Sequence, residues 1–211
     1  MSEICKELHV LFNRHERFEF PFDKSEIPKN GIYVLFEAGE KAHGGDRIVR
    51  VGTHTGENQL RSRLKQHYVI ENKDRSIFRK NIGRAILNRE NNSFLTQWNW
   101  DLTTRVAKDR YGHLMDWDKQ KETEKKVSSY IQGKLSFVVF EVKNKRERLT
   151  LESKIISTLS WCSECRPSDS WLGLHSPKRK IRQSGLWLVN ELYKEPLSRE
   201  EFEGLKDLIL F

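Results

Sequence analysis

The residues of this sequence best suited to chemistry begin with a cation and an imidazole on one predicted helix. Arg63 and His67 lie four residues apart in the segment 58–68, so they share one face of that helix. An arginine can hold two oxygens of a phosphate, and a histidine can give or take a proton near neutral pH. The pair therefore suits a phosphate group. The competing interpretation is an ordinary basic helix face in contact with water.

A carboxylate on the apolar side of a second predicted helix, residues 145–160, is the next candidate. The residues at helical spacing from Glu152 are apolar: Leu149, Ile155, Ile156 and Leu159. A charge in such a position costs free energy unless a partner neutralises it. We therefore expect Arg63, a lysine or a divalent cation beside it. Alternatively, Glu152 lies at the edge of the apolar stripe and extends into water.

Two short predicted strands, GIYVLFE and RIVRVG, carry a tyrosine and an arginine among apolar residues. Alternation along the first strand directs Tyr33 to the face opposite Ile32. Its hydroxyl could orient or deprotonate a water, although a half-buried tyrosine is also ordinary in a sheet. Gly31 and Gly52 would let backbone or substrate approach these strands closely. Arg50, on the second strand, is either a phosphate-binding residue or an arginine at the rim.

The elements that must position these residues belong to one predicted α/β (α+β) domain covering 1–211. β-Branched and aromatic runs predict strands at 31–37, 47–52 and 135–142. Apolar periodicity predicts helices at 2–13, 58–68, 76–89 with Ser76 as N-cap, 116–132, 145–160 and from about 198. We expect the helix at 116–132 to be mostly exposed. The remaining assignments are a polar hairpin loop at 38–46, a strand or irregular segment at 94–100 and a basic loop at 175–183.

Composition narrows the classes of partner and the compartment. The net charge of +8 and the sequence pI of about 9.4 favour a polyanion such as a nucleic acid. No apolar run could span a bilayer and no secretory leader is visible, so we expect a cytoplasmic protein without a membrane partner. The sequence has three cysteines, the isolated Cys5 and the CxxC pair Cys162 and Cys165. A zinc site built on that pair would need two further ligands, and no second CxxC or HxxxH motif supplies them. Reduced, partly buried thiols are therefore expected rather than a zinc site.

The order of these residues resembles the GIY-YIG endonuclease superfamily from about residue 28 to about 172. Its motifs are Gly31-Ile32-Tyr33, then Val51-Gly52, then Arg63 with His67, then Glu152. The string RVGTHTGENQLRSRLKQHY is the most specific part, because it joins the second strand, a polar turn and the Arg–His helix. The resemblance implies a small three-stranded antiparallel sheet flanked by helices. Two segments lie outside the matched core. One is a helical insertion at about 69–134, which we expect to recognise the target, and the other is a C-terminal extension at 173–211.

The resemblance also implies an activity, hydrolysis of a DNA phosphodiester with one divalent cation, Mg²⁺ or Mn²⁺. Carried over by motif, Glu152 would be the metal ligand and Arg63 would hold the scissile phosphate. Tyr33 would position or activate the attacking water, with His67 as a base or hydrogen-bond partner. A restriction or defence role fits a domain that acts without a separate DNA-binding module. Cleavage of both strands would call for a homodimer.

This sequence departs from the family pattern in two places. Relatives begin the second motif with a tyrosine, and this chain has Arg50 there. The base would then be Tyr33, His54 or His67, or the domain binds DNA without cleaving it. The asparagine that relatives place after the Glu helix is matched by Ser170 or Asn190.

Besides a DNA endonuclease and a DNA-binding domain without cleavage, a third alternative is a basic protein with a structural or RNA-linked role.

Two basic segments outside the motifs are predicted to contact the DNA backbone. The first lies on the helix 76–89 and contains Arg79, Lys80 and Arg84. The second lies in the loop 175–183 and contains Lys178, Arg179 and Lys180. Lysine and arginine contacts to phosphates give affinity without sequence information. Solvated basic faces remain the alternative for both.

Overall fold

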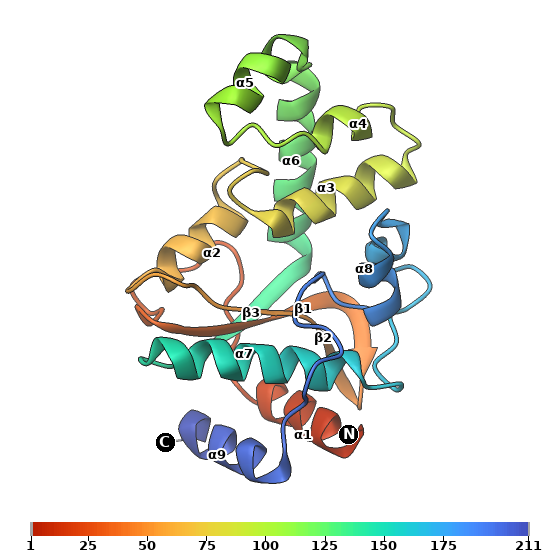
Figure 1. Ribbon diagram of the computed structural model, residues 1–211. Helices are drawn as coiled ribbons and strands as arrows, with labels where there is room; N and C mark the ends of the chain where they lie inside the picture. The colour runs from red at the N-terminus through yellow and green to blue at the C-terminus, as the bar shows by residue number, and fades with distance from the viewer. Residues whose placement is uncertain (1, 211) are drawn as a thin grey trace.

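The protein contains a three-stranded antiparallel sheet, and the computed structural model describes residues 2–210. The strands are β1 (Gly31–Ala42), β2 (Gly45–Gly52) and β3 (Leu135–Glu141), in the order β2-β1-β3. In the central strand, Tyr33 pairs with Gly52 on one side and with Val139 on the other. Helices cover both faces of the sheet (Figure 1), which confirms the predicted fold class.

The helices form a layer on each side of this sheet. Along the chain they are α1 (Ser2–Asn13), α2 (Leu60–Tyr68), α3 (Ile77–Arg89), α4 (Leu95–Trp98), α5 (Arg105–Tyr111), the 3₁₀ turn η1 (Gly112–Leu114), α6 (Trp117–Lys134), α7 (Lys145–Ser160), η2 (Leu172–His175), α8 (Arg179–Ser184) and α9 (Arg199–Leu210). Figure 1 shows α7, α1 and α9 below the sheet, and α2, α3 and α6 above it. Within residues 2–210, no helix combines the length and the apolar character needed to cross a bilayer.

Alternation along β1 separates two hydrophobic cores. Ile32 and Val34 pack in the core formed with α1, α7 and α9, which includes Phe12. Tyr33 packs in the opposite core, with Leu64 of α2 and further residues of α3 and α6. Successive side chains of a strand point to opposite faces, so this division follows directly from the sequence. The predicted placement of Tyr33 is confirmed.

Both glycines that border the paired strands are required by close contacts. A Cβ atom at Gly31 would lie 2.2 Å from the carbonyl oxygen of Phe140, and one at Gly52 would lie 2.2 Å from the hydroxyl of Tyr33. No side chain fits at such distances. The close approach expected from the sequence is therefore made at Gly52 by the phenol of Tyr33 itself.

Several predicted boundaries were wrong. The polar segment 38–46 is mostly strand, because β1 and β2 continue to a two-residue turn at His43 and Gly44, both with positive φ. Such a turn matches the twist of the paired strands, and polar residues suit an exposed hairpin. The aromatic segment 94–100 contains the short helix α4, and the basic loop expected at 175–183 contains α8. The helix α6 is less exposed than expected, with Val127 and Ile131 buried.

Candidate active site

Three polar side chains from separate elements form a buried row of hydrogen bonds. The Tyr33 hydroxyl lies 2.8 Å from Nε2 of His67, and Nδ1 of His67 lies 2.7 Å from Oγ of Ser76. Ser76 caps α3, where its Oγ also accepts from the backbone N–H of Arg79 at 3.2 Å. Tyr33 and His67 are both 0% exposed. Ser76, predicted only as an N-cap, thus also orients the imidazole.

Burial decides the charge state of His67. It lowers the pKa of the imidazole well below its usual value, and the nearby Arg63, Arg50 and Arg79 lower it further. The ring is therefore neutral at pH 7, with one nitrogen as donor and the other as acceptor. A neutral histidine beside a phenol can accept the phenolic proton.

Glu152 lies in a pocket between α7, the end of β2 and the chain that follows Trp187. Its Oε1 accepts a hydrogen bond from the backbone N–H of Thr53 at 2.9 Å. Burial raises the pKa of its carboxyl, and the charge of Arg50 opposes that rise. The pocket has a volume of about 460 Å³ and includes Arg50, Arg63 and Asn190 in its lining. The nearest recorded partner of the carboxylate is thus the backbone of Thr53, and two arginines share its pocket without a direct ion pair to it.

Arg50 is buried, 5% exposed, and lies between the phenol and the pocket. Its Nη1 donates to the carbonyl oxygen of Trp187 at 2.6 Å, and its Nε lies 3.4 Å from the Tyr33 hydroxyl. The guanidinium also lies over the ring of Phe78, 4.9 Å from the centroid. This placement excludes the alternative interpretation of Arg50 as an arginine at the rim of the site. Trp187, from the C-terminal segment, was not among the predicted site residues.

Arg63 extends from α2 into the same region. Its Nη1 donates to Gln66 at 3.1 Å and to the carbonyl oxygen of Arg75 at 3.2 Å. It lines both the Glu152 pocket and a neighbouring pocket of about 290 Å³ that includes Thr53 and His54. The structure thus brings together Arg63 and Glu152, which are far apart in the chain.

The accessory candidates divide into two groups. His54 is buried, which lowers its pKa, and its ring bonds the carbonyl oxygen of Gly56 at 2.6 Å. Asn190 lines the pocket of Glu152, as the alternative assignment required. Ser170 is exposed, lies 3.1 Å from the hydroxyl of Ser168 and is absent from that lining. Of the two asparagine equivalents, Asn190 is the one near the carboxylate.

Two further residues of this pocket were missed in the sequence. Glu191 has a positive φ of 63° and accepts from Oγ of Ser153 at 2.5 Å. Glu191 lines the same pocket as Glu152, and its charge contributes to the raised pKa of the Glu152 carboxyl. Asn81 of α3 also lines the pocket. No spacing rule links either residue to α7, so only the folded chain reveals them.

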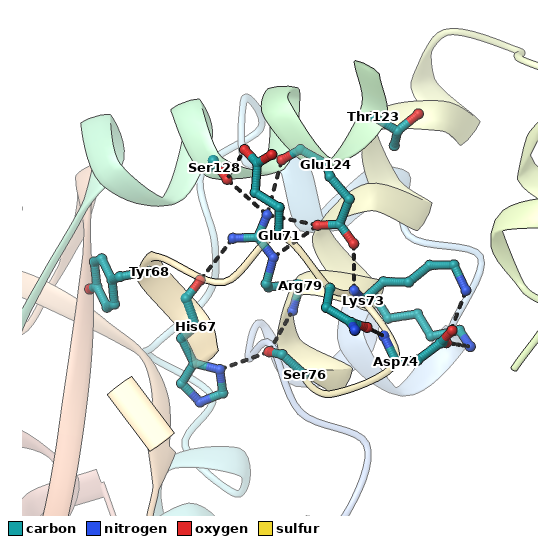
Figure 2. A network of polar contacts seen from close by, with 12 residues as sticks. His67, Tyr68, Glu71, Lys73, Asp74, Ser76, Arg79, Thr123, Glu124 and Ser128 are labelled. Atoms are coloured by element: carbon teal, nitrogen blue, oxygen red, sulfur yellow. Dashed lines mark hydrogen bonds and ion pairs between the residues drawn. The ribbon is translucent and has the colours of Figure 1, made fainter. Parts of the chain in front are cut away.

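The basic residues of α3 are not on an exposed face, contrary to the prediction. Arg79 pairs with Glu124 of α6 at 2.7 Å and donates to the carbonyl oxygen of His67 at 3.0 Å (Figure 2). Lys80 pairs with Asp74 at 3.0 Å, and Arg84 donates to Asn99 at 2.7 Å. The three side chains are each less than a tenth exposed. They are covered because α6 and the segments before and after α3 pack on this helix and supply its acceptors.

The second basic segment is exposed. Lys178, Arg179 and Lys180 lie at the start of α8 and face solvent. Lys180 donates to the carbonyl oxygen of Val189, at 3.1 Å, within the segment that lines the Glu152 pocket. These residues form a positive surface that adjoins the pocket.

The small antiparallel sheet and the helices packed on it bring Glu152, Arg50 and Arg63 around one pocket, with the Tyr33–His67 pair beside it. A family model described as the GIY-YIG domain matches residues 2–210, and the chain belongs to that family. The family is part of a nuclease superfamily whose members are generally divalent-metal-dependent endonucleases. No curated protein and no solved structure matches the chain.

Proposed function

We propose that this protein is a DNA endonuclease that uses one divalent cation, Mg²⁺ or Mn²⁺, bound at Glu152. The observation that carries the proposal is the convergence of the Glu152 carboxylate with Arg50 and Arg63 in one pocket. A partly buried carboxylate that shares a pocket with two arginines matches a site for a metal and a phosphate. The net charge of +8 supports DNA as the partner.

The oxygen donors of the pocket fit a hard cation. Mg²⁺ prefers oxygen ligands, keeps several waters and needs few protein carboxylates. Glu152 would hold it, with Glu191 and Asn190 lining the same pocket. The metal would supply positive charge for a phosphate oxygen during attack. Arg63 would bind the phosphate by its guanidinium, and Arg50 would add a second positive charge where relatives have a phenol.

We assign proton transfer to Tyr33 and His67. With its proton on Nδ1, toward Ser76, the neutral imidazole accepts from the Tyr33 hydroxyl at Nε2. The phenolic oxygen then takes a proton from the attacking water while its own proton passes to His67. This route needs one tyrosine, so the arginine at position 50 is compatible with cleavage.

The alternative is a DNA-binding domain without cleavage, and one observation favours it. Tyr33 is fully buried, with Arg50 against its hydroxyl, so the phenol does not meet solvent. Under the nuclease proposal, a bound phosphate draws the guanidinium of Arg50 toward itself and uncovers the phenol. Under the alternative, Arg50 binds phosphate and leaves Tyr33 covered.

Plasmid cleavage separates these two functions. Supercoiled plasmid and phage DNA with modified bases would be incubated with the wild-type protein and Mg²⁺, Mn²⁺, Ca²⁺ or EDTA. Metal-dependent nicking or linearisation supports the endonuclease. Salt-sensitive binding without product in any metal supports the binding domain, and no DNA binding excludes both. The ratio of linear to nicked product as protein concentration rises tests the proposed homodimer.

The pH dependence of cleavage should reveal the effect of Arg50 on Glu152. Only the ionised carboxylate binds metal, and the charge of Arg50 lowers its otherwise raised pKa. Replacing Arg50 by glutamine removes that charge, so the pKa should rise further and the acid limb of the rate profile should move to higher pH. Arg61→Gln is the control, because Arg61 is bonded to the carbonyl oxygen of Ile27 and does not line the pocket. Identical acid limbs in the two variants would contradict the coupling.

Salt dependence should identify the basic surface that contacts DNA. We expect Lys178→Ala and Arg179→Ala each to lower the slope of log K against log salt by about 0.9 for every phosphate that the side chain neutralises. Arg84→Ala, whose guanidinium is buried, should leave the slope unchanged. Fluorescence anisotropy over a range of salt concentrations measures the slopes. Equal slopes for wild type and the α8 variants would place the DNA elsewhere.

A further inference from the structure

Five cysteine and histidine side chains meet on the face of the sheet opposite Tyr33. Cys5 and His9 come from α1, His43 from the turn between β1 and β2, and Cys162 and Cys165 from the chain after α7. The cysteines belong to the core below the sheet, whereas Tyr33 belongs to the core above it. This cluster is therefore separate from the candidate active site.

The ligand atoms are spaced like those around a tetrahedral metal ion. The donor atoms of Cys5, His9, His43 and Cys165 all lie within 4.8 Å of one another, and the sulfur of Cys162 adjoins this group, 3.4 Å from Nε2 of His43. The sulfurs of Cys5 and Cys165 are 3.2 Å apart, and Nε2 of His43 is 3.0 Å from the sulfur of Cys165. Zn–S and Zn–N bonds of about 2.3 and 2.0 Å give donor separations of roughly 3.5 to 3.8 Å. Outward shifts of a few tenths of an ångström would admit zinc.

The hydrogen bonds of the two histidines distinguish their roles. Nδ1 of His9 donates to the carbonyl oxygen of Cys5 at 2.9 Å, and its Nε2 accepts from the backbone N–H of Ile48 at 3.2 Å. Both nitrogens of His9 are therefore engaged by backbone, and each lies farther from sulfur, at 3.8 Å from Cys5 and 3.9 Å from Cys165. His43 instead directs Nε2 at the sulfurs, with Cys162 at 3.4 Å.

The outer side of His43 has the partner that a metal ligand needs. Its Nδ1 faces a carboxylate oxygen of Glu164 at 3.7 Å, and its side chain is 3% exposed. A histidine that binds a metal usually has its second nitrogen oriented by a carboxylate or carbonyl group. His43 also occupies a turn position with φ of 52°, where asparagine or glycine is the common residue.

We propose that Cys5, His43, Cys162 and Cys165 bind one zinc ion. Three thiolates and one imidazole complete a closed tetrahedron, which is the composition of a structural rather than a catalytic zinc site. Cys5 and Cys165 are 0% and 8% exposed, so the ion is shielded from substrate. The site joins α1, the β1–β2 turn and the end of α7. It thereby fixes the strand and helix that carry Arg50 and Glu152.

Metal analysis of the wild-type protein tests the proposal directly. Protein expressed without a polyhistidine tag and purified without chelator should contain one zinc per chain by elemental analysis. Removal of zinc by a strong chelator should lower the Tm, and added Zn²⁺ should restore it. Zinc-free protein whose Tm does not respond to Zn²⁺, or a disulfide between Cys5 and Cys165 in freshly purified protein, would overturn the site.

Substitutions test the ligand set, with His9 as the matched control. His9→Gln should keep one zinc, and Cys162→Ser should lose most of it. Per bound cobalt ion, the thiolate charge-transfer absorption of Cys162→Ser should be about one third lower than that of the wild-type protein, since one of three sulfurs is lost. Glu164→Gln should weaken zinc binding by about 10- to 100-fold through its effect on His43. Zinc retained in Cys162→Ser but lost in His9→Gln would overturn the assignment of Cys162.

Discussion

Replacing Glu152 by glutamine should reduce metal-dependent cleavage by about 10²- to 10³-fold, the usual loss when a charge-stabilising group is removed. Glutamine has nearly the same size, and its carbonyl oxygen can still accept from the N–H of Thr53. The substitution therefore removes the negative charge and little else. A neutral amide binds a divalent cation weakly, so higher Mg²⁺ or Mn²⁺ concentrations should restore part of the rate.

Glu147→Gln is the matched control for this experiment. Glu147 lies in the first turn of the same helix and is exposed, so its loss should leave cleavage unchanged. Without divalent metal, both variants should bind DNA at least as tightly as wild type, because neither loses a positively charged side chain. Single-turnover cleavage rates at several metal concentrations provide the measurement. Cleavage at the wild-type rate by Glu152→Gln would remove this carboxylate from the mechanism.

Replacing Arg79 by alanine should lower the free energy of unfolding by about 3 to 5 kcal/mol, the cost of breaking a buried ion pair from one side. The substitution leaves Glu124, which is 2% exposed, as an uncompensated buried charge. Burial already raises the pKa of Glu124, and Arg79 opposes that rise. Without Arg79 the folded-state pKa should rise further above the unfolded value. The variant should thus be least stable at neutral pH and recover as acid protonates Glu124.

Urea unfolding followed by tryptophan fluorescence measures this effect. Arg179→Ala, an exposed arginine of α8, should change the free energy by no more than about 0.5 kcal/mol. The double variant Arg79→Met with Glu124→Leu should regain most of the lost stability, since no charge then stays buried. An Arg79→Ala protein as stable as wild type at neutral pH would show that Glu124 finds another partner. Figure 2 shows why the site should also respond, because Arg79 bonds the His67 carbonyl oxygen.

The placement of Tyr33 shows how far local rules reach. The sequence predicted the face on which Tyr33 lies, the shared face of Arg63 and His67, and the cap of α3 at Ser76. Each follows from the fixed periods of strand and helix or from a capping preference, which involve residues close in the chain. The strand ends predicted around 38–46 were wrong. A polar segment of a hairpin has the same sequence pattern whether its residues pair as strands or form a loop, so the pattern did not distinguish the two.

The basic residues of α3 show where local rules fail. Arg79, Lys80 and Arg84 have the composition of a solvated face, and their burial depends on Glu124, Asp74 and Asn99. Glu124 belongs to α6, which reaches α3 only through the tertiary packing of the insertion. A charged residue is buried when a distant partner neutralises it, and no pattern within one helix reports that partner.

The sequence by itself determined the family, the strand and helix types and the residues that match its motifs, because these depend on neighbours in the chain. Tertiary structure alone decided that Arg50 separates Tyr33 from the pocket of Glu152, and that Glu191 and Asn190 join that pocket. It likewise assembled Cys5, His43 and the 162–165 pair from three distant elements. The side chains of both sites meet because the helices and strands that carry them pack against one another. That packing depends on the whole chain, whereas periodicity depends on neighbouring residues.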